Sequence, residues 1–237
     1  MGARVGKALI GVAALLAAAA LALPGGPGEG ARVTAQDARD PARAAPPFEA
    51  QIRRIKGDLR RHVKGTSWRS GCPVPLRELR HVRVVRWDFE GRVKRGRLIV
   101  HRRHARRIVK AMRRLYRKRF PIRRMHLIDR YGADDRRSMA ADNTSAFNCR
   151  YVAGTTRWSM HAYGKAIDIN PRENPYVTPS GHVSPPQGRP YADRSRTAKG
   201  MVKRGGPAFN ALRRVGWEWG GDWSGTKDYM HFSANGR

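Results

Sequence analysis

Acidic residues are scarce in this sequence: its 237 residues include 18 Asp and Glu against 49 Lys and Arg, a formal net charge of +31 at pH 7. A protein with such an excess of positive charge is expected to meet polyanions. Arginine dominates even where no periodicity is evident. A compositional bias therefore explains the excess as readily as a dedicated binding surface does.

Long apolar runs are also rare, and the clearest one lies near the N-terminus. Arg4 and Lys7 precede the apolar residues 8–23, and a Pro/Gly-rich turn follows from Pro24. This is the layout of a secretory signal. We therefore expect residues 1–35 to be a signal peptide and the protein to be secreted and associated with the cell wall. The alternative is an uncleaved N-terminal anchor, although the run is slightly short for a bilayer span.

Cysteine is limited to Cys72 and Cys149. Neither has a CxxC partner, which argues against a cysteine metal site. In an oxidising, exported setting two thiols in one domain predict a disulfide, and two unpaired buried thiols are the alternative. Closing the long loop between them would stabilise the fold by roughly 4 kcal/mol in the chain-entropy model.

Export narrows the choice of polyanion. Residues 1–35 carry three basic residues and one acidic residue, so a charge of +29 remains after their removal. Outside the cell, the accessible polyanions are cell-wall polymers and anionic lipid headgroups. We therefore expect the basic surface to bind one of these, and we expect no nucleic-acid partner.

The N-terminal part of the mature chain is predicted to be a linker followed by a helix. Residues 24–47 lack apolar periodicity and cannot bury enough surface to fold alone. Apolar residues then recur at helical spacing, which predicts a basic amphipathic helix over 48–63. The recurring residues are Ile52, Ile55, Leu59 and Val63. This helix would lie on the wall or the membrane, or pack onto the main domain.

The rest of the chain mixes strands and helices. Alternating β-branched residues over 79–89 and 92–100 predict a hairpin, and helical spacing that stops at Pro121 predicts a helix over 104–120. We also expect strands over 122–128 and 166–170, a Pro/Gly/Ser-rich loop over 174–197 and a helix over 208–215. The predicted fold class is α+β, one compact domain with helices on one side of a small antiparallel sheet.

One constellation of residues carries the chemistry. The segment Ser159–Asn170 contains His161 and Asp168, and His231 follows near the C-terminus. Two imidazoles and one carboxylate suit a borderline divalent ion such as zinc, and a fourth position left to water distinguishes a catalytic site from a structural one. Gly164 allows the chain to turn so that His161 and Asp168 reach the same ion. We predict one catalytic zinc ion, carried by the sheet, and metal-assisted hydrolysis.

Three further residues suit such a reaction. Asp228, three residues before His231, is the candidate general base that accepts a proton from water. Arg150 is the candidate clamp for a substrate carboxylate or a developing oxyanion, because a guanidinium binds such groups in bidentate fashion. Trp223 belongs to an aromatic cluster that is expected first of all to pack in the core, yet its nearness to Asp228 suggests a floor for the substrate groove.

Seven segments from the second half of the chain and one from the first half carry a resemblance. They are Phe147–Arg150, Ser159–His161, Gly164–Pro171, Asn174–Tyr176, Gly216–Trp223, Asp228–Phe232, Gly71–Pro73 and Phe120–Ile122. Together they resemble the zinc D-alanyl-D-alanine carboxypeptidase (VanY-like) family of peptidoglycan peptidases, over roughly residues 66–232.

The resemblance implies roles for individual residues. His161, Asp168 and His231 would bind zinc, and Asp228 would be the catalytic base, a position at which many members have Glu. Arg150 and Ser159 would contact the substrate. Residues 65–237 would then be the zinc peptidase domain, preceded by the basic linker and helix over 36–64.

The predicted function is an exported zinc peptidase that hydrolyses D-amino-acid-containing bonds in peptidoglycan stem peptides, in first place as a D-alanyl-D-alanine carboxypeptidase. An endopeptidase for L-alanyl-D-glutamate or cross-bridge bonds is the alternative within enzymes. A non-catalytic cell-wall-binding module is the alternative from another class. We expect peptidoglycan peptides as partners and a monomeric protein.

Overall fold

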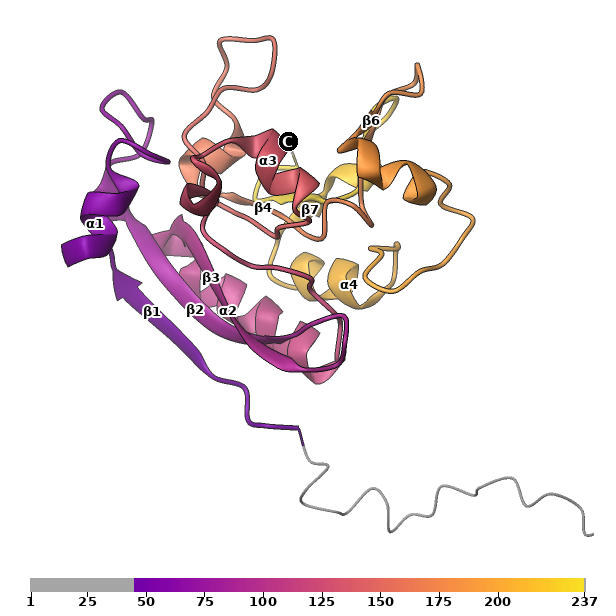
Figure 1. Ribbon diagram of the computed structural model, residues 1–237, viewed down its shortest axis with the longest axis horizontal. Coiled ribbons are helices and arrows are strands. Elements are labelled where there is room, and N and C mark those ends of the chain that lie inside the picture. The colour runs from indigo at the N-terminus through magenta and orange to yellow at the C-terminus, as the bar shows by residue number, and fades with distance from the viewer. Residues whose placement is uncertain (1–44, 237) are drawn as a thin grey trace, which may run out of the picture. The chain divides into compact units, whose positions relative to one another are not determined.

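The computed structural model describes residues 45–236. The predicted signal peptide or anchor over 1–35 and nearly all of the predicted linker lie outside these residues. Residues 46–237 make up one compact unit, and Figure 1 shows its elements. No helix of the described part is long and apolar enough to cross a bilayer.

Helices and strands are interspersed along the unit. The α-helices are α1 (Gly57–Val63), α2 (Arg102–Arg117), α3 (Asp135–Ala140) and α4 (Pro207–Arg213). The 3-10 helices are η2 (Leu76–Glu78), η3 (Ile128–Tyr131), η4 (Met160–Tyr163), η5 (Pro186–Tyr191) and η6 (Gly220–Asp222). The strands are β1 (Ala50–Arg54), β2 (Leu79–Trp87), β3 (Val93–His101), β4 (Ala166–Asp168), β5 (Tyr176–Val177), β6 (Val183–Ser184), β7 (Glu218–Trp219), β8 (Lys227–Asp228) and β9 (His231–Ser233).

These strands form three small antiparallel sheets, in the orders β1-β2-β3, β4-β9-β7 and β6-β5-β8. The predicted α+β class is confirmed. The predicted hairpin is confirmed as β2 and β3, the predicted helix over 104–120 as α2, and the predicted short helix as α4.

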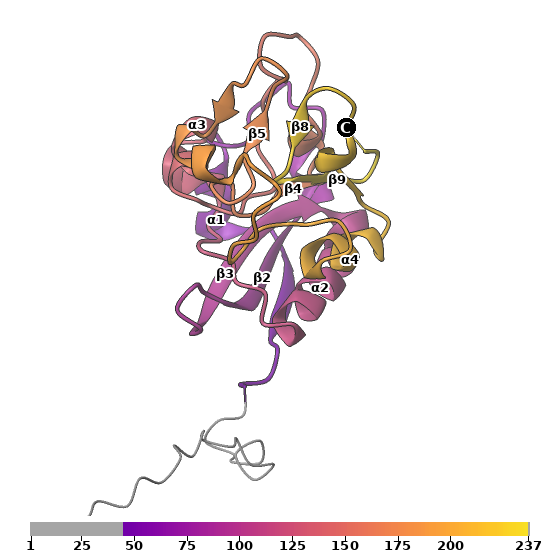
Figure 2. The same cartoon turned by 90° about the vertical axis from the view of Figure 1, so that its right-hand side faces the viewer.

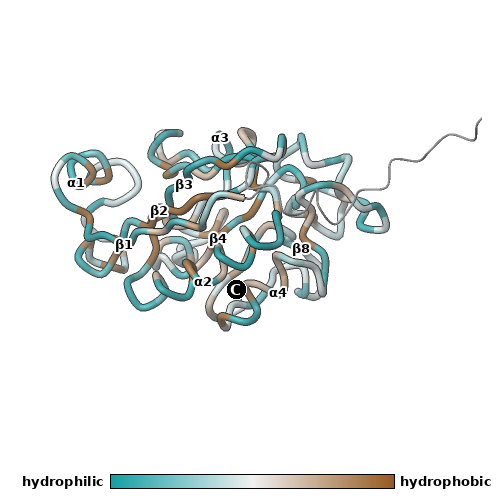
Figure 3. The backbone as a smooth tube through the Cα atoms, turned by 90° about the horizontal axis from the view of Figure 1, so that it is seen from below, coloured by the Kyte–Doolittle hydropathy of each residue, from teal (hydrophilic) through white to brown (hydrophobic). Residues whose placement is uncertain are grey.

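One buried apolar cluster joins the hairpin, α2, α4 and the β4-β9-β7 sheet. Its members from α2 recur at helical spacing and include Ala105, Ile108, Ala111, Met112 and Leu115. Figures 1 and 2 both show α2 lying against the hairpin and next to α4. Trp217, Trp219 and Phe232 are buried in the same cluster, so the core role expected first for the aromatic cluster holds for these two tryptophans. Figure 3 shows apolar stretches along β2 and beside β4, with many hydrophilic turns around them.

The single amphipathic helix predicted over 48–63 is wrong. Residues Ala50–Arg54 form β1, which pairs with β2 in a five-residue register, and only Gly57–Val63 are helical. Gly57 adopts a positive φ of 53°, which a continuous α-helix does not allow. The free edge of β2 offers hydrogen-bonding partners to alternate residues of β1, and this tertiary pairing outweighs the local helical pattern.

The apolar spacing itself still has a meaning, because Ile55 and Val63 are buried in a second cluster and Leu59 packs against it. These contacts and the pairing of β1 make residues 50–63 part of the folded unit. The domain therefore begins before the predicted boundary at 65, and the alternative in which this segment packs onto the main domain is the one observed.

The strand predicted over 122–128 is also wrong. The backbone N–H of Ile122 donates to the carbonyl of Trp87, and the backbone N–H of Arg97 donates to the carbonyl of Met125. The helix η3 then begins at Ile128. The apolar side chains of this segment are buried on more than one side, so the run marks burial without a regular ladder. The predicted loop over 174–197 does contain short elements, namely β5, β6 and η5.

The predicted disulfide between Cys72 and Cys149 is present, and it spans 77 residues. It connects the segment after α1 with the segment that leads into the metal-type ligands. Cys149 is buried in the cluster that also holds Ile55 and Val63, so the bond lies on the hairpin side of the candidate site.

Candidate metal centre and active site

Three buried side chains meet at one point. His161, Asp168 and His231 each place one potential ligand atom within 4.8 Å of the others. The His161 Nε2 atom lies 3.2 Å from Asp168 Oδ2 and 3.2 Å from His231 Nδ1, and His231 Nδ1 lies 3.0 Å from Asp168 Oδ1. Ligand atoms on a tetrahedral zinc ion are about 3.3–3.6 Å apart, given bonds of about 2.0–2.2 Å. The two imidazole nitrogens therefore lie 3.2 Å apart, and each has a different Asp168 oxygen at 3.0–3.2 Å, close to the spacing of ligand atoms on such an ion.

The chemistry of the three atoms fits a cation. The Nδ1 atom of His161 contacts the carbonyl oxygen of Ala146, so in the neutral ring Nε2 presents a lone pair to the cluster. A carbonyl that orients a ligating imidazole in this way is a common feature of metal sites. Burial alone would raise the pKa of Asp168, but attraction and hydrogen bonding to His161 and His231 outweigh it and hold that pKa well below its ordinary range. A buried carboxylate facing two imidazoles fits a divalent ion such as zinc.

Strand pairing brings two of these residues together from distant parts of the chain. Asp168 ends β4, and His231 begins β9 directly opposite it in the antiparallel register. Directly opposed residues have their Cβ atoms about 4.5–5.5 Å apart on one face of the sheet. The alternation of Asp168 with the fully buried Ile167 and Ile169 is as predicted, with the carboxylate facing the site and the isoleucines facing the core.

The third residue comes from η4, a single turn held at both ends. The Ser159 Oγ atom accepts a hydrogen bond from the backbone N–H of His161 at 3.3 Å and so caps the turn. Gly164 ends it in the left-handed region, with φ 63° and ψ 29°. The Gly164 carbonyl accepts a hydrogen bond from the backbone N–H of His101 at 2.8 Å, which fastens the turn to the end of β3. Ser159 thus holds the turn that carries His161. This structural role differs from the substrate contact that was predicted for Ser159.

Asp228 lies close enough to His161, Asp168 and His231 for their charges to act on it. It pairs through β8 with Tyr176 of β5, and a Cβ atom on Gly220 would lie 2.6 Å from its carbonyl oxygen, so the backbone passes very close here. Its Oδ1 atom is buried and makes no hydrogen bond with the described residues. Burial, reinforced by the negative charge of Asp168, raises the pKa of Asp228 to about 7. A carboxyl whose pKa lies near neutrality is suited to accepting and releasing protons.

Arg150 faces the same region. One of its nitrogens lies 2.8 Å from a carboxylate oxygen of Asp135 in α3, while its buried Nε atom has no partner among the described residues. Its positive charge acts to lower the pKa of Asp228, so the two groups are within electrostatic reach. The structure therefore places the Arg150 guanidinium near the centre, where Asp135 holds it.

A short hairpin extends from these residues. The backbone N–H of Ser159 donates to the carbonyl of Arg150 at 3.1 Å, and Tyr151 pairs with Trp158 one step further out. The two rings stack with centroids 4.0 Å apart. In Figures 1 and 2 this loop and the β5–β6 hairpin project on the same side of the unit.

Trp223 is half-buried and packs against a ligand. Its ring centroid lies 5.7 Å from that of His231, and its Nε1 atom donates to the carbonyl of Gly236 at 2.5 Å. The predicted place beside the site is therefore observed. The other histidines of the described chain do not join the cluster of three.

A buried polar network, which pattern analysis did not find, supports the strand that carries Asp168. Arg123 bridges the carboxylates of Asp142 and Glu173, at 2.8 Å and 3.1 Å. Asn170 adopts a positive φ of 43° directly after β4, and its side chain accepts a hydrogen bond from the backbone N–H of Arg123 at 3.1 Å. The only signal in the sequence was the cluster of Asn and Glu residues after Asp168.

A buried His/Asp/His triangle beside an isolated carboxylate defines a metallopeptidase type of centre. Residues 153–234 match the model of a protein family described as D-alanyl-D-alanine carboxypeptidase. The resemblance inferred from the sequence is confirmed over this segment, which contains His161, Asp168, Asp228 and His231. Arg150 and the disulfide cysteines precede it. Comparisons with curated proteins and with solved structures gave no match.

Proposed function

We propose that this protein is an exported, zinc-dependent D-alanyl-D-alanine carboxypeptidase that trims peptidoglycan stem peptides. The observation that carries the proposal is the convergence of the His161, Asp168 and His231 ligand atoms beside the half-buried Asp228, inside the segment that matches the family. The family match supports a peptidoglycan peptidase of this general type. Zinc, the particular bond and export are our inferences.

Zinc bound by the three ligands would supply a Lewis acid that polarises the scissile carbonyl and acidifies water. Asp228 then acts as the base. Its carboxylate accepts the proton of the attacking water as oxygen bonds to the carbonyl carbon. It returns that proton to the leaving amine as the C–N bond breaks. The raised pKa of Asp228 refers to the protein without a cation, and a nearby dication would lower it.

Arg150 supports the release of a terminal residue over cleavage inside a chain. A substrate that ends in D-alanine presents a free carboxylate, and a guanidinium is the natural group to bind it in bidentate fashion. Asp135 holds one nitrogen of Arg150 at 2.8 Å, which fixes the side chain before substrate arrives. An endopeptidase would have no terminal carboxylate to bind at this place.

A digest of defined muropeptides tests the proposal. Stem pentapeptides, tetrapeptides and cross-linked dimers are each incubated with the purified protein, with and without zinc after chelation, and the products are identified by mass. We expect zinc-dependent release of D-alanine from the pentapeptide alone. Cleavage of the dimer or of the bond before D-glutamate would establish the endopeptidase alternative. If no product forms under any metal condition, the proposal that the protein is an enzyme is refuted.

Two variants separate the roles of the residues. Asp228→Asn should keep its zinc content and lose turnover, because the amide cannot accept the proton. Loss of the metal together with activity would make Asp228 a ligand. Arg150→Lys should raise KM for the pentapeptide more than it lowers kcat, because an ammonium cannot form the bidentate contact.

Export rests on the apolar run over 8–23 and its basic flank. A fusion of residues 1–45 to a reporter that is active only outside the cytoplasm tests it, and N-terminal sequencing of the exported product distinguishes a cleaved signal from an anchor.

A further inference from the structure

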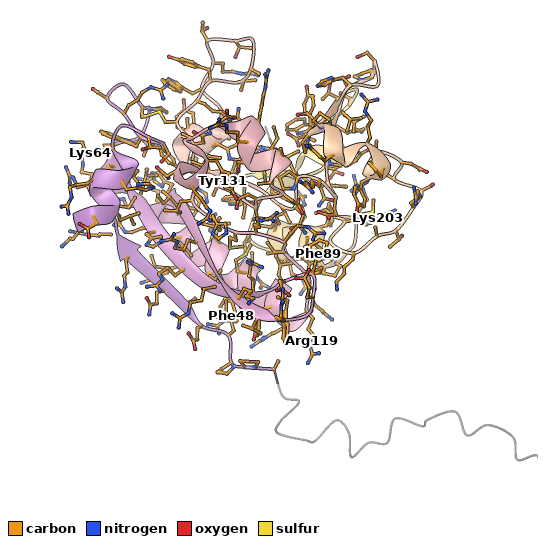
Figure 4. The ribbon with its side chains drawn as sticks, viewed as in Figure 1. Phe48, Lys64, Phe89, Arg119, Tyr131 and Lys203 are labelled. Carbon is orange, nitrogen blue, oxygen red and sulfur yellow. A yellow bond between two sulfur atoms is a disulfide. The ribbon has the colours of Figure 1, made fainter. Side chains whose placement is uncertain are left out.

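A groove separate from the candidate active site runs between β1 and α2. It encloses about 1230 Å³, and none of the predicted site residues lines it. Strand β1 is an edge strand, since it pairs only with β2 within its sheet. One wall of the groove is therefore an open strand edge and the other is a helix. Phe48, labelled in Figure 4, lies where the described chain enters β1 and lines the same groove.

The floor of the groove is apolar. Ile52 is 38% exposed and lines the groove, although it sits on the α2 face of the sheet opposite the buried Val82. Ala105 and Val109 of α2 complete this floor. Together these three side chains give the groove a small apolar strip that can contact the carbon atoms of a ligand.

The walls are strongly basic. Arg102, Arg106 and Arg113 line the groove from α2, at positions that recur on one face of the helix. They span eleven residues, or about 16 Å of helix. Arg80 and Arg103 line it as well, and the acidic lining is limited to Glu49.

Most of this charge is not neutralised within the fold. Arg102 pairs with Glu78. In residues 45–236, by contrast, no carboxylate lies within ion-pair distance of Arg103, Arg106 or Arg113. Guanidinium groups that converge without acidic partners favour a bound anion, and they bind phosphate best of the common anionic groups.

The shape of the groove selects among phosphate-bearing partners. A planar membrane surface cannot enter a concave groove, whereas a single linear chain can lie along about 16 Å of helix. Single-stranded nucleic acid binds through exposed aromatic faces on which its bases stack. Phe48 is the aromatic residue of the lining and is half-buried. The Arg113 guanidinium carbon lies over its ring, 5.4 Å from the centroid, and the ring also packs on Tyr116. The groove thus offers cations and an aliphatic floor, and no free stacking face.

We propose that the groove between β1 and α2 binds a linear polyol-phosphate polymer, an anionic chain with repeated phosphodiester groups and no bases. The aliphatic carbons of the polyol contact Ile52, Ala105 and Val109, and successive phosphates contact Arg103, Arg106 and Arg113. This binding is independent of the proposed peptidase reaction. It would hold the protein on an anionic cell-wall polymer while the active site handles peptides.

Binding of the full-length protein to a synthetic glycerol-phosphate oligomer, measured by calorimetry over a series of salt concentrations, tests the proposal. The test variant is R103Q/R106Q. The control is R213Q/R214Q on α4, which removes the same charge from two exposed arginines that do not line the groove. Circular dichroism and cleavage of a free stem peptide confirm that both variants fold.

We expect R103Q/R106Q to bind the oligomer about tenfold more weakly at moderate salt. The slope of its log affinity against log salt concentration should fall in magnitude by an amount that corresponds to roughly 1–2 fewer phosphate contacts. The control should bind within about twofold of the original protein, since only the overall charge has changed. An equal loss of affinity in both variants would overturn the assignment of binding to the groove and would leave the overall charge as the explanation. Equally tight binding of single-stranded DNA with the same number of phosphates, or a requirement for anionic lipid vesicles, would overturn the choice of polymer.

Discussion

Gly164→Ala is the most direct test of how the metal-ligand turn is held. Gly164 ends η4 at φ 63° and ψ 29°, three residues after His161. A Cβ atom built there would lie 2.6 Å from the backbone nitrogen of His101 and 3.1 Å from the backbone carbon of Val100. These are backbone atoms inside the hairpin, so they cannot move aside as a flexible side chain would.

The structure provides a matched control in Gly132. This glycine ends η3 at φ 67° and ψ 26°, nearly the same conformation, yet a Cβ atom there would meet nothing within 4 Å. Gly132→Ala should therefore cost only the left-handed backbone energy of about 1–2 kcal/mol. Gly164→Ala should cost this amount and an overpacking energy of about 1–3 kcal/mol as well.

Urea unfolding of both variants measures these free energies, and zinc titration of the chelated proteins measures the effect on the site. We expect a loss of about 3–4 kcal/mol for Gly164→Ala. We also expect at least about tenfold weaker zinc binding, because the turn that orients His161 is displaced. If the two alanine variants lose the same stability and both bind zinc normally, the close approach of η4 to β3 does not support the ligand.

Three further outcomes are expected. Burial, helped by hydrogen bonding and repulsion from Asp142, raises the pKa of Glu173 to about 8. The protonated Glu173 therefore stabilises the fold fully below pH 4.5, and this stabilisation is lost as the pH rises through 8. The Glu173→Gln variant lacks this titration, so its stability relative to the original protein should rise between pH 5 and pH 9, on the order of 2–3 kcal/mol. Urea midpoints that keep the same difference at both pH values would contradict this. Replacing Cys72 and Cys149 by serine should cost roughly 4 kcal/mol through the 77-residue loop, measured by unfolding without reductant, and an unchanged midpoint would show that the loop is already ordered in the unfolded chain. Chelation should lower the melting temperature, and zinc at a hundred times its dissociation constant should restore about 2.7 kcal/mol, whereas calcium should not, since it prefers oxygen ligands.

Prediction from the sequence succeeded where a feature is local. The alternation in β2 and β3 and the spacing in α2 are repeated often enough within single segments to identify the elements without their neighbours. The same holds for Asp168, whose flanking isoleucines face the core. The short pattern over 48–63 failed because the hydrogen-bonding edge of β2 lies elsewhere in the chain, and no local spacing reveals it.

The sequence by itself indicated which residues form the candidate metal centre, because two histidines and an aspartate are residue types that such a centre uses. It also predicted the disulfide, since two cysteines in one exported domain allow a single pairing. Only the tertiary structure decided that Asp168 and His231 face each other across β4 and β9, that Asp135 holds Arg150, and that Asp228 has a buried carboxylate oxygen and a raised pKa. These properties depend on distances between segments far apart in the chain, and electrostatic energy and strand register are set by those distances and not by residue type.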